Sequence, residues 1–267
     1  MVLYVDADAP TGPFATFSVI RRRVKLSAAV FRFHAELERF IARERRGIAF
    51  AYECARAATL KQAIESLGVP HTELGRIIVN TQQATLDRIV REGDLVQAFP
   101  YEPGTAPFAE PLAFIADAHL GGLARMLRML GFDAEFDNAL HDREIIEQAA
   151  AEKRVVLTRD RELLKCREIL RGCFVHALKP EMQLREVARR YGLAARMRPF
   201  TLCLHCNVLL ESADPQSVAA RVPERIQVQY SRFMHCPACH RIYWEGSHWE
   251  RMRSVLAAAL EVPGPTI

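Results

Sequence analysis

Apolar and polar positions change their pattern at residue 112. Leu112–Ala116 and Val155–Thr158 are short runs that are apolar almost throughout, which is typical of strands buried on both faces of a parallel sheet. Between them, leucines recur three and four residues apart from Leu120 to Leu130, as on one stripe of a helix. Further helices are expected at Asp142–Ala151, Arg161–Cys166 and Glu181–Tyr191, with a strand at Cys173–His176. This alternation predicts an α/β fold, a doubly wound parallel sheet with right-handed crossovers.

Residues 27–102 predict a separate, smaller α+β unit. Thr59 is a favourable N-cap and Gly68 a favourable stop for a helix over Thr59–Leu67. Strands are expected at Ala28–His34, Ile48–Glu53, Arg76–Asn80 and Leu95–Phe99. Residues 103–111, which are rich in proline, predict a linker to the larger unit.

Composition narrows the class of protein. The 267 residues are 50% hydrophobic and 25% charged, with a formal net charge of +4. No stretch offers the roughly 18 apolar residues that a membrane helix needs. Acidic residues precede arginines in the first 25 residues, the reverse of a secretory signal. Four of the seven cysteines form two C-x-x-C pairs, which favours metal binding in a reducing cytoplasm over a disulfide framework.

The two C-x-x-C pairs predict a zinc site. Cys203 and Cys206 form the first pair, and Cys236 and Cys239 form the second, with 29 residues between the two pairs. A zinc ribbon tolerates such an insertion between its two halves. Four thiolates suit a closed, tetrahedral and therefore structural Zn²⁺ site.

Three aspartates are expected to meet at one edge of the parallel sheet. Asp117 and Asp160 follow the predicted strands, and Asp142 opens the helix that leads into the second strand. Open α/β sheets bind ligands at the carboxyl ends of their strands. Oxygen ligands without a nearby His or Cys indicate Mg²⁺ or Mn²⁺, which activates water in phosphodiester hydrolysis. Taken singly, Asp142 and Asp160 are equally well explained as helix caps.

Four arginines near these aspartates are candidate phosphate clamps. Arg159 and Arg161 flank Asp160, and Arg125 and Arg128 lie on what we expect to be the polar side of the first helix. A solvated helix face explains Arg125 and Arg128 about as well.

The segment FIADAHLGGLARMLRMLGFDAEFD…HDREIIEQAAAEKRVVLTRDRELL resembles a PIN-like ribonuclease domain. More narrowly, residues 112 to about 253 are similar to the family named after the C-terminal RNase domain of the mut-seven protein. The resemblance implies that Asp117, Asp142 and Asp160 hold the catalytic metal. PIN domains usually add a fourth acid, for which Asp133, Glu135 and Asp137 are available here. Asp137, the nearest to Asp142, is our candidate.

The N-terminal unit resembles the ubiquitin-like and sulfur-carrier β-grasp domains through SLGVPHTELGRIIVN and EGDLVQAFPYEPG. The chain continues past this point, so sulfur-carrier chemistry is excluded, and docking of a protein partner remains open. The expected organisation is a flexible extension at 1–26 with Arg21-Arg22-Arg23, a β-grasp domain at 27–102, a linker at 103–111, a PIN-like domain at 112–198, a zinc ribbon at 199–255 and a tail at 256–267.

These features predict a cytoplasmic, divalent-metal-dependent ribonuclease. Residues 181–267 hold 11 arginines and 8 acidic residues, and Tyr243–Trp249 resembles the family's Y-W-x-G-S-H-W signature. Arginine and aromatic side chains together suit binding of RNA, either single-stranded or structured tRNA or rRNA. For Tyr243 and Trp244, the preferred interpretation is that they close a very small core supported by zinc. A non-catalytic RNA- or ribosome-binding adapter is the main alternative. A receiver domain is weaker, because Ala116-Asp117 supplies only one of the two acids it needs.

Overall fold

The computed structural model describes residues 28–53 and 57–260. The chain divides into two compact units, residues 1–101 and 102–267. The expected extension at 1–26, with its three arginines, lies outside the described residues. No helix in the described ranges is long and apolar enough to cross a membrane.

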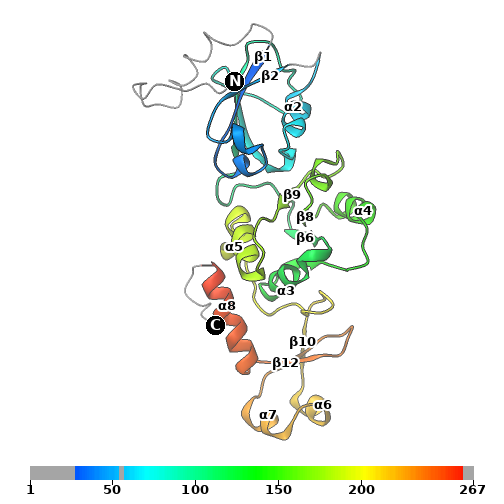
Figure 1. The fold of residues 1–267 in the computed structure, drawn as a ribbon. Coiled ribbons are helices and arrows are strands. Elements are labelled where there is room, and N and C mark those ends of the chain that lie inside the picture. Colours follow the sequence, from blue (N-terminus) through cyan, green and yellow to red (C-terminus); the bar gives the residue numbers. More distant parts are fainter. Residues whose placement is uncertain (1–27, 54–56, 261–267) are drawn as a thin grey trace. The chain divides into compact units, whose positions relative to one another are not determined.

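In its described residues, the first unit is a mixed five-stranded sheet with one α-helix, the β-grasp arrangement (Figure 1). Its strands are β1 (Ala28–Phe33), β2 (Phe50–Glu53), β3 (Leu74–Val79), β4 (Gln82–Gln83) and β5 (Leu95–Pro100), in the order β2-β1-β5-β3-β4. Only β1 and β5 pair in parallel. Helix α2 (Leu60–Ser66) begins at the predicted N-cap Thr59, whose side chain and that of Gln62 form a capping box.

The predicted strands and helix of this unit are confirmed, with ends that move by one or two residues. The two-residue strand β4 was not predicted, because two glutamines carry no alternating apolar pattern. Three 3-10 helices, at Ala35–Arg39, Arg43–Arg45 and His71–Glu73, complete the unit.

The second unit contains the expected parallel sheet. Its strands are β6 (Ala113–Ala116), β7 (Asp133–Glu135), β8 (Val155–Thr158) and β9 (Gly172–Phe174), in the order β7-β6-β8-β9. The edge strand β7 was missed, because Asp-Ala-Glu shows no apolar run. The helices are α3 (Gly121–Met129), α4 (Asp142–Glu152) and α5 (Pro180–Tyr191). The helix expected at Arg161–Cys166 is a short 3-10 turn at Leu163–Lys165, so this prediction was too long.

Helices cover both faces of this sheet, as the continuous apolar runs require (Figure 1). Ile115 packs in one cluster with Ile145 of α4. The adjacent Phe114 points to the opposite face, where its ring lies 5.8 Å from that of Tyr191 in α5. Helix α3 stops at Gly131, whose φ of +85° and close approach to the Arg198 carbonyl exclude a β-carbon.

The C-terminal part contains a small antiparallel sheet next to the two cysteine pairs. Strands β10 (Glu211–Ala213), β11 (Phe233–His235) and β12 (Ile242–Trp244) pair in that order. The insertion between the cysteine pairs holds α6 (Pro215–Val218) and α7 (Glu224–Gln229) over a core of Val218, Val222 and Phe233. Helix α8 (Ser247–Leu260) runs into the expected tail and returns to α5, where Arg185 donates to the Ala258 carbonyl at 2.9 Å.

The segment expected to be a linker is held against α5. The Gly104 N–H donates to the Arg189 carbonyl at 2.8 Å, and Ala106 is buried. The guanidinium of Arg196 lies over the Phe108 ring and 3.7 Å from the Glu110 carboxylate. This segment is therefore part of the second unit.

Candidate active site and zinc centre

The four cysteines of the two C-x-x-C pairs converge on one point. Their sulfur atoms all lie within 4.8 Å of one another, and no other such group of ligand atoms occurs among the described residues. In each pair, the N–H of the second cysteine donates to the sulfur of the first at 3.4 Å. Such bonds stabilise thiolates, and the four-sulfur donor set fits Zn²⁺. Cys203, Cys206, Cys236 and Cys239 thus form the predicted metal-binding cluster.

The pKa values of these thiols differ, so metal binding at the cluster is expected to depend on pH. Burial, together with hydrogen bonds from neighbouring thiols, raises the pKa of Cys206 to about 12. Burial opposes ionisation of Cys239 as well, but hydrogen bonds from Arg241 and other groups hold its pKa at about 6. Without a metal, Cys206 keeps its proton at neutral pH, and zinc must displace it. Zinc affinity is therefore expected to rise with pH.

The aspartates predicted to be catalytic lie along the carboxyl edge of the parallel sheet. Asp117 follows β6, Asp160 lies two residues beyond β8, and Asp142 is the first residue of α4. Thr158 connects two of them: its buried hydroxyl donates to Asp117 Oδ2 at 2.7 Å and accepts from the Asp160 N–H at 2.9 Å. The sequence did not predict that the Thr158 hydroxyl bridges these two aspartates.

The capping alternatives for these aspartates are only partly supported. His141, not Asp142, is the N-cap residue of α4, and its N–H donates to Glu144 Oε2 at 2.9 Å. The exposed carboxylate of Asp142 is therefore not needed to cap α4. One oxygen of Asp160 accepts from the Glu162 N–H at 2.7 Å. Its other oxygen has no partner in the described part of the chain.

The rim, defined as Asp117, Asp142 and Asp160, carries negative charge without a matching cation. None of the three carboxylates pairs with a Lys or Arg within the described ranges. Burial raises the pKa of the neighbouring Cys166 thiol, and the charges of Glu168, Asp142 and Asp160 raise it further. The rim oxygens do not come within 4.8 Å of one another as a set, however.

Comparison with known protein families gives two matches in the order expected from the sequence. A family model described as the Mut7-C RNAse domain matches residues 112–256, more than half of the chain. The chain belongs to the Mut7-C RNase domain family. A second model, described as Mut7-C ubiquitin, matches residues 26–105. Neither the curated proteins nor the solved structures gave a match.

Membership of the Mut7-C family confirms both resemblances noted in the sequence. It places the chain among nuclease-type proteins, for which RNA is the implied substrate. The matched region contains the rim and all four cysteines, so the parallel sheet and the zinc ribbon belong to one family unit.

Three of the four arginines suggested as phosphate clamps reach the surface of this Mut7-C domain. Arg125, Arg159 and Arg161 are exposed. The guanidinium of Arg161 lies 5.8 Å from the centre of the Phe174 ring, and Arg159 donates to the Ala177 carbonyl at 3.4 Å. Asp137, the suggested fourth acid, is exposed two residues beyond β7, and its Oδ1 accepts from the Ala139 N–H. The other acid candidate Asp133 is paired with Arg154 at 2.7 Å.

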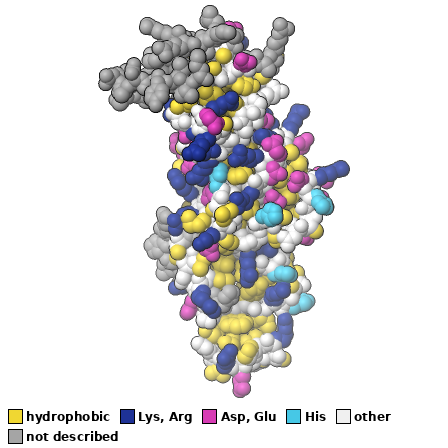
Figure 2. Space-filling view, in the orientation of Figure 1, with side chains coloured by type: hydrophobic (Ala, Val, Ile, Leu, Met, Phe, Trp, Pro, Cys, Tyr) yellow, Lys and Arg dark blue, Asp and Glu magenta, His cyan; other side chains and the backbone are white. Residues whose placement is uncertain are grey.

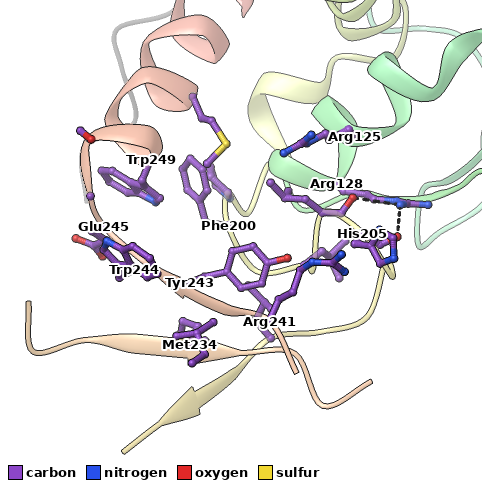
Figure 3. Close-up of a pocket in the computed structure, with 18 of the residues that line it drawn as sticks. Arg125, Arg128, Phe200, His205, Met234, Arg241, Tyr243, Trp244, Glu245 and Trp249 are labelled. Carbon is purple, nitrogen blue, oxygen red and sulfur yellow. Dashed lines mark hydrogen bonds between the residues drawn. The ribbon is translucent and has the colours of Figure 1, made fainter. Parts of the chain in front are cut away.

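The prediction that Arg128 contacts phosphate is wrong, because its side chain is buried and bound to backbone carbonyls. It is only 6% exposed, and its guanidinium donates to the carbonyls of Ala134 at 2.8 Å, His205 at 2.8 Å and Leu204 at 3.3 Å (Figure 3). The first carbonyl belongs to β7 and the other two to the first cysteine pair. Helical spacing does not distinguish an exposed arginine from one covered by a distant segment, which is why the prediction failed.

Asn207 completes the same contact and was not predicted. Its side chain accepts from the Ala134 N–H at 3.1 Å and donates to Asp133 Oδ1 at 2.5 Å. Arg128 and Asn207 together attach the first cysteine pair to the edge strand β7. We refer to these contacts as the ribbon clamp.

Replacing Arg128 by methionine is expected to weaken the ribbon clamp while keeping most of the apolar volume. Three carbonyls lose a charged donor, and the expected loss of unfolding free energy is ~3 kcal/mol. Arg128→Lys is expected to restore little, because an ammonium cannot match the planar fork of a guanidinium. Urea unfolding of the zinc-loaded protein measures both variants. Arg125→Met, an exposed change one turn earlier in α3, is the control.

Proposed function

We propose that this protein is a divalent-metal-dependent ribonuclease whose rim carboxylates hold Mg²⁺ or Mn²⁺. The observation that carries the proposal is the rim itself: three carboxylates from distant parts of the sequence, at the ligand-binding edge of the sheet, with no cationic partner among the described residues. Mg²⁺ usually keeps several waters and binds through only one or two carboxylates. A rim more open than the cysteine cluster therefore suits a hydrated ion.

Each rim residue has a definite part in this proposal. Thr158 holds Asp117 so that its carboxylate stays at the edge of the sheet. The same hydroxyl holds the backbone of Asp160, while Asp142 and, less directly, Asp137 approach from other elements. When bound, the ion supplies an activated water and stabilises charge on the phosphodiester oxygens. Arg159 and Arg161, exposed on either side of Asp160, supply positive charge for the RNA phosphate.

Thr158 gives a test of positioning that leaves the carboxylates in place. Thr158→Val removes the hydroxyl from a buried site at almost constant volume. We expect ~10–100-fold lower activity and a higher Mn²⁺ concentration for half-maximal cleavage, as for residues that orient metal ligands. Thr158→Ser keeps the hydroxyl and is expected to retain most of the activity. Equal losses in both variants, with an unchanged Mn²⁺ dependence, would contradict the positioning role.

The proposal as a whole is tested by metal-dependent cleavage of RNA. The zinc-loaded full chain is incubated with end-labelled single-stranded RNA at increasing Mg²⁺ or Mn²⁺, and products are resolved by length. Cleavage that requires the ion supports the proposal, and the product pattern distinguishes endonuclease from exonuclease action. Addition of Zn²⁺ alone is the control, because it fills the cysteine cluster without supplying a rim ion.

A non-catalytic RNA or ribosome adapter remains the second candidate. It is favoured by the separation of the rim oxygens, which do not form a preassembled ligand set. An adapter binds RNA equally well with and without Mg²⁺ and releases no product. Its zinc ribbon would carry the binding, in the reducing cytoplasm that thiolate ligands suit. The β-grasp unit would then be the site for a protein partner.

A further inference from the structure

A broad groove separates α3 from the zinc ribbon. It encloses about 1590 Å³, more than the ~300–1,000 Å³ typical of a small-molecule site. One wall comes from α3 and the turn after β7, and the other from α7, β11, β12 and the start of α8. Its shape suits a segment of an extended polymer.

Positive charge lines this groove with little to balance it. Arg125, Arg225 and Arg232 reach it from three different elements, and none has a hydrogen-bond or ion-pair partner in the described part of the chain. Only two acidic residues, Asp137 and Glu245, also line it. In Figure 2, Lys and Arg side chains border the apolar surface of the zinc ribbon. Unpaired arginines on facing walls are suited to successive phosphates.

Aromatic side chains line the same groove as these arginines. Phe136, Phe200, Tyr230 and Trp244 line the groove, and each is half-buried. Tyr230 and Trp244 also pack against the apolar core of the ribbon. Figure 3 shows Phe200, Trp244 and Trp249 on one side of the cavity, with Arg125 and Arg128 on the other. Accessible rings that face a cationic wall can stack unpaired bases while exposed arginines such as Arg125 hold the phosphates.

One end of the groove opens at the carboxyl edge of the parallel sheet. Gly121, at the start of α3, and Phe136 and Asp137, just beyond β7, line that end. Asp117 lies four residues before Gly121 at the same edge. A chain that enters along the zinc ribbon is therefore directed towards the rim.

We propose that this groove binds single-stranded RNA and leads it to the rim, so that unpaired RNA is the substrate class. That the groove leads RNA to the rim rests on the proposed ribonuclease function. That the groove binds RNA does not. A duplex hides the faces of its bases in the helical stack and offers no rings to the aromatic side chains. An acidic peptide would use the arginines alone.

The binding step can be measured without turnover. Zinc-loaded full chain carrying Asp160→Asn is titrated, in the absence of Mg²⁺, into a fluorescent oligoadenylate of about 12 nucleotides, and anisotropy gives the Kd at several salt concentrations. The double variant Arg225→Glu/Arg232→Glu is expected to bind about tenfold more weakly, and the slope of its salt dependence to fall by ~0.7 for each phosphate that is no longer neutralised. Arg251→Glu, an exposed change on α8 outside the groove, is the matched control.

Stacking is tested separately from charge. Trp244→Leu is expected to weaken binding at least fivefold, as for the loss of one stacked base, and Trp244→Phe to restore most of it. An abasic oligomer of the same length and the annealed duplex are both expected to bind at least tenfold more weakly than the single strand. Zinc content and far-ultraviolet circular dichroism verify the fold of each variant.

Three outcomes would overturn the proposal. These are unchanged affinity of the folded arginine variant, equal affinity for duplex and single strand, and displacement of the RNA by polyglutamate at matched charge concentration without any effect of Trp244. The last result would identify a docking site for an acidic protein. If the arginine variant cleaves RNA at the rate of the wild-type protein, only this inference is refuted. If the wild-type protein binds RNA tightly but does not cleave it, only the ribonuclease proposal is refuted.

Discussion

Asp160→Asn is expected to abolish Mg²⁺- or Mn²⁺-stimulated cleavage of single-stranded RNA while the protein stays folded. The substitution keeps the shape of the side chain and its acceptor oxygen, so the turn made with the Glu162 N–H can persist. What is lost is one negative charge at a rim with no cation of its own. A loss of at least ~100-fold in cleavage rate is expected, as for removal of the group that activates water.

The matched control for Asp160→Asn is Glu147→Gln. Glu147 is an exposed carboxylate on α4 that pairs with Arg143 at 2.8 Å and lies away from the strand ends. Glu147→Gln removes the same charge as Asp160→Asn but at a site away from the rim. The activity of this variant should therefore stay near that of the parent protein. Undiminished cleavage by folded Asp160→Asn would refute the assignment of the rim as the active site. A loss that excess Mn²⁺ partly reverses would identify weakened metal binding as the cause.

Removal of the zinc centre is the second large effect. Cys236→Ser is expected to lower zinc content from one ion per chain to near zero and to unfold the ribbon. Structural zinc sites contribute ~10–16 kcal/mol of apparent binding free energy at neutral pH. Among the described residues, the fully buried part of the ribbon's apolar cluster is Val218, Val222 and Phe233, with partly buried side chains around them. This small core is too little to replace that contribution.

Atomic absorption and proteolysis of the loaded and chelated protein measure this loss. Protection should disappear from residues 199–260 and persist in the parallel sheet, whose core does not involve the cysteines. Cys173→Ala, at a buried cysteine of β9 outside the cluster, is the control and should keep its zinc. A ribbon that stays protected without metal would show that α8 and the ribbon clamp suffice to hold it.

Most strands of the two larger sheets were predicted from local patterns, and the strands that were missed share one cause. The buried strands β6 and β8 are apolar almost throughout, so their type did not depend on any other part of the chain. Strand β7 reads Asp-Ala-Glu and forms because its backbone pairs with β6. Its carboxylates are then accommodated by Arg154 and Asn207, which lie far away in sequence. No local pattern reports such distant compensation.

The sequence by itself determined the four cysteines of the metal-binding cluster, the family type of both units and most of their helices and strands. Fixed spacing between cysteines and between apolar residues expresses geometry that is local to the backbone. Only the tertiary structure decided that Arg128 is buried in the ribbon clamp, that Thr158 joins two rim aspartates, and that basic and aromatic side chains from distant segments line one groove. These features depend on which distant segments pack against a side chain. A local sequence pattern does not show those tertiary contacts.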